Sequence, residues 1–127
     1  MNFLSYKINT KHRNKCPTSK ASIWSVSTWN EIQLFGIASE NEWFSPSRDI
    51  LWSARNSSCG KLEKLGDSVK NKLFIAKFRC DNNHEWHGYP VLPRDRDIPP
   101  EEILESWKLK GIIDKREKRK IQKGQFL

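Results

Sequence analysis

Two histidines and an acidic residue lie together in the run His84-Glu85-Trp86-His87, five residues after Arg79. Paired imidazoles near a carboxylate can act as acid and base in metal-independent cleavage of a phosphodiester. A cation such as Arg79 would stabilise the charge that develops on phosphorus. On a strand, residues 85 and 87 share a face and 84 faces away, so the histidines converge only if a turn ends after His84. If the protein is an enzyme, these residues predict a nuclease, but we expect a non-enzymatic role.

The same histidines belong to a second set with metal-binding character. His84 and His87 follow Cys80 by four and seven residues, and Cys59 lies twenty-one residues before Cys80. Zinc takes thiolate and imidazole ligands in a tetrahedron, and the end of a hairpin can bring such side chains together. The spacing matches no standard zinc finger, and Cys80 falls on an apolar strand face, where a thiol commonly serves as a small hydrophobe. We therefore expect no cofactor, with structural zinc as the alternative.

Tryptophan is frequent, with six in 127 residues. Aromatic rings among cations form stacking platforms for unpaired bases, and they also fill the cores of small domains. Trp29, Trp52 and Trp107 lie among apolar neighbours at structural spacing, which predicts core positions. Other rings lie beside polar residues and chain breaks, or in the second strand of the expected hairpin. The candidates for contact with a partner or a base are Trp43, Trp86 and Tyr89.

Positive charge is concentrated at the two ends of the chain. Residues 1–20 contain five cations and no acid, and residues 107–127 contain eight cations against two acids; because the total is +8, residues 21–106 carry −3. Cationic ends attract polyanions at long range, and nucleic acid is the commonest of these in a cytoplasm. We expect both ends to contact phosphate, provided that they lie close together. The cations are Lys11, Arg13 and Lys15, and Lys115, Arg116, Lys118, Arg119, Lys120 and Lys123.

Three functional hypotheses follow. The first is a small basic cytoplasmic protein that binds nucleic acid through its ends, RNA in preference to DNA. The second is a non-catalytic interaction module with an acidic protein partner, such as a toxin neutraliser, an antitoxin or a subunit of a defence complex. The third is the nuclease with His84 and His87. Walker, GxGxxG, GxSxG and HExxH motifs are absent, which argues against the enzyme classes that they define.

The elements that must position these residues begin with a hairpin. Residues 72–80 alternate as a strand, 81–84 predict a turn, and 85–92 predict a second strand. Pro90 either places this second strand at a sheet edge or ends its pairing. Residues 22–38 allow either a pair of strands or a helix. We favour the helix, because Thr28 and Glu31 have capping-box spacing and Trp29 begins an apolar face that continues at positions 32 and 35.

Two further helices are expected near the end of the chain. A helix over residues 100–110 begins with Pro100 and two glutamates, ends at Gly111, and should dock on the sheet through residues 103, 104 and 107. Asp114 is placed to cap a strongly basic helix over residues 115–122.

The length of 127 residues allows one domain with a modest core. The predicted fold class is α+β, a short antiparallel sheet with a C-terminal helix packed on it and a basic helical tail. We expect an N-terminal arm or edge strand (1–20), a core (21–98) containing the hairpin 72–92, and the C-terminal helix with its tail (99–127). No apolar run reaches the roughly 18 residues of a membrane span. The odd count of three cysteines favours a reducing cytoplasm, and the oligomeric state is left open.

Overall fold

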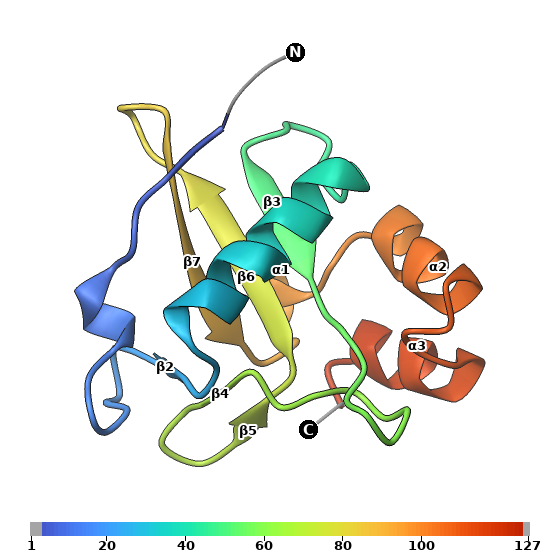
Figure 1. Cartoon of the computed structure of the whole chain (residues 1–127). Coiled ribbons are helices and arrows are strands. Elements are labelled where there is room, and N and C mark those ends of the chain that lie inside the picture. The colour runs from blue at the N-terminus through green and yellow to red at the C-terminus, as the bar shows by residue number, and fades with distance from the viewer. Residues whose placement is uncertain (1–3, 126–127) are drawn as a thin grey trace.

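Two small sheets and three α-helices make up residues 4–125, the part of the chain described by a computed structural model (Figure 1). The larger sheet has the strand order β1 (Ser5–Tyr6), β7 (Glu85–Val91), β6 (Ile75–Cys80), β3 (Ile50–Ser53). The smaller sheet has the order β2 (Ile23–Trp24), β4 (Gly66–Asp67), β5 (Lys72–Leu73). The helices are α1 (Thr28–Glu40), α2 (Glu101–Leu109) and α3 (Lys115–Gln122), with 3-10 turns η1 (Thr10–His12) and η2 (Asp95–Asp97). The predicted α+β class is confirmed.

The predicted hairpin forms the centre of the larger sheet, but its first strand starts at Ile75, because residues 72–73 pair within the smaller sheet instead. Strands β6 and β7 pair antiparallel, with Lys77 opposite Tyr89 and Arg79 opposite His87. The turn between them ends at His84, whose φ of 61° places it in the left-handed region. Pro90 is tolerated because β7 has only the two-residue strand β1 on its other side. That strand runs parallel to β7, with Ser5 opposite Glu85, so the sheet is mixed rather than purely antiparallel.

Helix α1 lies across one face of this sheet (Figure 1). It begins after Ser27, whose hydroxyl accepts a hydrogen bond from the Asn30 backbone at 3.1 Å, so the cap is one residue earlier than Thr28. The predicted apolar face is wrong at two of its three positions: Trp29 is 68% and Ile32 42% exposed, and only Phe35 is buried. The buried positions are Glu31, Leu34, Phe35 and Ala38. Glu31 is accommodated on the inner face because Arg13 neutralises its charge there, and Trp29 and Ile32 on either side of it are exposed.

Helices α2 and α3 form as predicted and lie beside the β3 edge of the sheet (Figure 1). Helix α2 buries Ile103, Leu104 and Trp107. Gly111 follows it with a φ of +77°, as a helix-terminating glycine does. Asp114 and Glu117 form a reciprocal capping box at the start of α3. The face of the sheet opposite α1 is covered in part: Trp52 and Lys77 are buried on it, whereas Arg79 is exposed.

Most of the tryptophans lie in one continuous core. Trp52 and Trp107 are buried as predicted, and the Trp107 ring packs edge-on against Trp43 with their centroids 5.9 Å apart. Trp43 and Trp86 are only 2% and 4% exposed, so neither offers its ring to a partner or a base. Among residues 4–125, no helix has the length and apolar character needed to cross a membrane.

Candidate nucleic-acid interface

The face of the larger sheet turned away from α1 carries the charged residues of the hairpin. Phe78 points toward α1, where its ring centroid lies 5.4 Å from that of Phe35. Because side chains alternate along a strand, Lys77 and Arg79 point to the opposite face. Their partners on β7, Tyr89 and His87, point the same way. Two rows of polar side chains therefore cross this face.

Two adjoining hollows, of about 590 and 690 Å³, lie over these rows. They share Arg79, Tyr89 and Asp97, and together we call them the sheet-face hollow. Residues of the N-terminal arm form one wall, and the segment after β7 forms the other. Six cationic side chains line it against two carboxylates. The cations are Lys11, Lys20, Lys77, Arg79, Arg94 and Arg96, and the carboxylates are Asp95 and Asp97.

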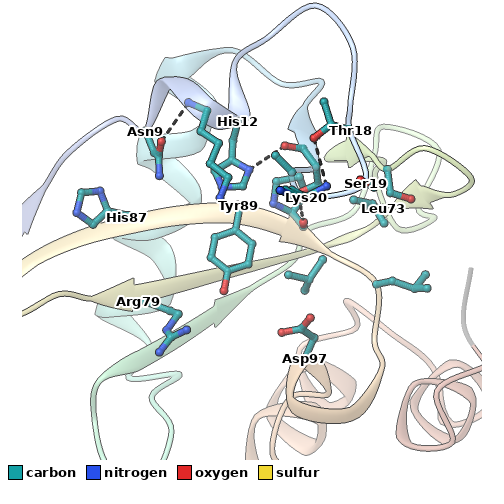
Figure 2. A pocket seen from close by; sticks show the side chains of 17 residues that line it. Asn9, His12, Thr18, Ser19, Lys20, Leu73, Arg79, His87, Tyr89 and Asp97 are labelled. Carbon is teal, nitrogen blue, oxygen red and sulfur yellow. Dashed lines mark hydrogen bonds between the residues drawn. The ribbon is translucent and has the colours of Figure 1, made fainter.

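His12 forms part of the arm wall (Figure 2). Its ring stacks on Tyr89 with centroids 5.1 Å apart, and its Nδ1 donates a hydrogen bond to the Ser22 carbonyl at 2.8 Å. Burial lowers its pKa, against the effect of the Ser22 carbonyl; the Lys11 charge also lowers it and Glu31 raises it. His12 is therefore uncharged at neutral pH, with Nε2 as the nitrogen that accepts a hydrogen bond or a proton.

Tyr89 occupies the middle of the hollow. In Figure 2 its hydroxyl points between Arg79 and Asp97. Burial raises the pKa of Tyr89, and the Asp97 carboxylate raises it further, whereas the charge of Arg79 and a hydrogen bond with it act in the opposite direction. The hydroxyl stays protonated at neutral pH and can donate a hydrogen bond to a ligand oxygen.

His87 is held at the hairpin end of the hollow by a hydrogen bond with Asp81. Its Nε2 donates to the Asp81 carboxylate at 2.7 Å, and this hydrogen bond lowers the pKa of Asp81. Its Nδ1 is buried and has no hydrogen-bond partner among residues 4–125. The Nε2 atom of His87 is therefore engaged by Asp81.

The other predicted catalytic and metal residues are dispersed. Arg79 and His87 line the hollow, but His84 lies exposed in the turn and, like Glu85, does not line it. Cys59 is exposed in the segment between β3 and β4, where its thiol contacts Ser57. Within the described part of the chain, no three His, Cys, Asp or Glu side chains are grouped to hold a metal ion.

The predicted phosphate-binding cations fall into two separate sets. Lys11 lines the hollow, Lys15 is exposed but does not line it, and Arg13 is turned inward to Glu31. Helix α3 lies on the other side of the body from η1 (Figure 1), so the two ends do not form one surface. Lys118 is paired with Glu101 and Glu105. The remaining tail cations are exposed: Lys115, Arg116, Arg119, Lys120 and Lys123.

Several lining residues were not singled out from the sequence. His12 and Lys20 reach the hollow because the arm folds back onto β7, and the only hint of this was the excess of cations in residues 1–20. Arg94 and Arg96 alternate with aspartates, a pattern typical of surface ion pairs. Comparison with protein-family models, with curated proteins and with solved structures gave no match to this chain.

Proposed function

We propose that this protein binds nucleic acid, with single-stranded RNA preferred, in the sheet-face hollow. The proposal rests on one observation: six cations and only two carboxylates line a single concave surface. Clustered cations bind phosphate by displacing its condensed counterions. The site differs from the sequence hypothesis, because the cations come from the arm, the hairpin and the segment after β7 rather than from two converging ends.

The lining also fits an unpaired strand. Single-strand-binding proteins combine a cationic groove with aromatic or guanidinium planes on which bases stack. Tyr89 and Arg79 supply such groups here. Thr18, Ser19 and Ser68 add hydroxyls at the rim, which can hydrogen-bond the 2′-OH that distinguishes RNA from DNA. We place this activity in the cytoplasm, which suits the three free cysteines.

The test compares two variants that each remove two cations. The hollow variant is Lys20→Gln/Arg79→Gln, and the tail variant is Arg119→Gln/Lys120→Gln; all four side chains are exposed. Fluorescence anisotropy with a labelled single-stranded RNA measures affinity from 50 to 200 mM salt. We expect the hollow variant to lose about tenfold in affinity and to reduce the salt slope by roughly two. The tail variant should stay within about threefold of the wild type.

Equal losses in the two variants would show that overall charge, not the hollow, governs binding. A larger loss of RNA affinity in the tail variant would place the binding site on the C-terminal helix α3 instead of in the hollow. If the wild type binds neither RNA nor DNA of the same sequence, the proposal fails. A preference for the DNA oligonucleotide would retain nucleic-acid binding and remove the role of the hydroxyls.

The outer face of α1 favours an interaction module as a second candidate. Trp29, Ile32 and Ile37 are 68%, 42% and 40% exposed there. Exposed apolar side chains grouped on one element are typical of protein interfaces. The test is affinity capture from the host extract with the wild type and with Trp29→Ser/Ile32→Ser. One protein at fixed stoichiometry that the variant loses would support an antitoxin or complex subunit.

A further inference from the structure

Helix α3 presents a one-sided stripe of positive charge. At 3.6 residues per turn, its exposed cations fall within roughly 140° of the helix circumference and extend along roughly 12 Å. They are Lys115, Arg116, Arg119, Lys120 and the C-cap residue Lys123. Ile121 lies on the opposite side, where it is fully buried. The orientation of the stripe is therefore fixed by packing.

The body of the protein holds this helix firmly without neutralising the stripe. Lys118 Nζ lies 2.7 Å from Glu101 Oε1 and 3.3 Å from Glu105 Oε1. These contacts join α3 to α2. They pair the two glutamates of α2 with Lys118, which is not part of the stripe. The capping box of Asp114 and Glu117 fixes the first turn. The stripe points away from both sets of acids.

The spacing within the stripe is unfavourable for the helix alone. Residues four apart on a helix are neighbours, and like charges at that spacing repel one another. Lys115 and Arg119, Arg116 and Lys120, and Arg119 and Lys123 are three such pairs. A polyanion along the stripe would relieve this repulsion. A nucleic-acid duplex carries one negative charge per roughly 1.7 Å of its axis, which is enough to face all five cations along the roughly 12 Å of the stripe.

We infer that the outer stripe of α3 is a second nucleic-acid-binding surface, and that the protein joins two nucleic-acid segments, one in the sheet-face hollow and one on α3. The inference rests on the proposed function, because it needs the hollow as the first site. None of the five cations of the stripe lines the hollow, and the buried Ile121 turns the stripe outward from the body. One strand in the hollow therefore leaves the stripe open to another segment.

A bridging assay tests this directly. Biotinylated RNA is fixed on streptavidin beads, the protein is added, and retention of a second, fluorescent RNA is measured. The wild type should retain it, and the tail variant Arg119→Gln/Lys120→Gln should retain about fivefold less while its anisotropy affinity stays within about threefold. Circular dichroism checks that the variant keeps the helix content of the wild type.

The other outcomes separate the two claims. If the wild type binds RNA by anisotropy but the tail variant bridges equally well, a dimer joins two hollows and the inference falls while the proposed function stands. If no RNA binds at all, both fall. Co-sedimentation with phosphatidylcholine–phosphatidylserine vesicles is measured in parallel. Tail-dependent vesicle binding without RNA bridging would assign the stripe to an anionic lipid surface and overturn the inference.

Discussion

The carboxylate of Glu31 lies 2.6 Å from the guanidinium of Arg13, on the face of α1 that is turned into the core. Glu31 is 1% exposed, and its second oxygen accepts a hydrogen bond from the Tyr6 hydroxyl. Arg13 also donates to the Val26 carbonyl at 2.5 Å. Two points of the N-terminal arm are thus fixed to one helix. Because His12 precedes Arg13 directly, the same contact positions one wall of the hollow.

Replacing Glu31 with glutamine should lower the free energy of unfolding by about 3 kcal/mol, because it leaves the partly buried charge of Arg13 without its counter-ion. Urea denaturation measures this. Glu40→Gln, an exposed position in the same helix, is the control and should change stability by less than about 0.5 kcal/mol. Equal effects in the two variants would mean that the pair does not stabilise the fold.

Two glycines should respond to alanine in opposite directions. A methyl group on Gly88 would lie 2.3 Å from the Phe78 ring, whereas one on Gly36 meets nothing within 4 Å. Gly36 lies inside helix α1, where alanine is favoured by about 1 kcal/mol, so Gly36→Ala should raise the thermal midpoint. Gly88→Ala should lower stability by about 3 kcal/mol or prevent folding, as overpacking does. A neutral Gly88→Ala would contradict the close packing of β6 and β7 under α1.

Asp97 fixes the segment after β7 onto the sheet. The Lys77 ammonium, in a side chain 6% exposed, lies 2.8 Å from the Asp97 carboxylate and donates to the Arg96 carbonyl at 3.2 Å. Asp97→Asn should therefore cost about 2 kcal/mol of unfolding free energy, because a buried cation loses its charge partner. Asp95→Asn, in the same 3-10 turn, is the matched control. Its left-handed φ of 52° suits asparagine, so denaturant unfolding should show little loss.

Stability should fall on acidification because of His12. Its folded-state pKa lies below the ordinary value near 6.5, so the unfolded chain takes up a proton first as the pH drops through about 6.5, and unfolding is favoured. The charged or titratable groups that face it, Lys11, Glu31 and Tyr89, are unchanged in His12→Asn. Urea midpoints at pH 7.5 and 5.5 should therefore differ more for the wild type than for this variant. A variant with the same difference would show that His12 titrates normally.

Local sequence patterns predicted the helices, strands and turns better than they predicted the tertiary contacts between them. The hairpin, Asp114 as a helix cap and Gly111 as a terminator depend on neighbours in sequence, and all three are found in the structure. The face of α1 was mispredicted because the pairing of Glu31 with Arg13 depends on residues eighteen positions apart. Trp43 looked exposed beside polar residues, yet its indole donates to Ser106 at 3.0 Å from within the core.

The candidate site was predictable only in part for the same reason. Arg79 and His87 were singled out because they belong to one hairpin, and their cross-strand pairing follows from its register. His12 stacks on Tyr89, seventy-seven positions later in the sequence. Hydrophobic periodicity within a segment cannot predict such a long-range contact. The charge of the arm indicated a polyanion, but the place where the arm docks depends on its contacts with Glu31.

The parallel pairing of Ser5 with Glu85 has a consequence for the order in which the chain folds. Contacts between such distant residues close late in folding, since loop-closure entropy opposes them until the intervening structure is in place. Strand β1 therefore pairs only after β7 has formed, whereas the Arg13 end of the arm can reach Glu31 earlier, because these two residues are only eighteen positions apart.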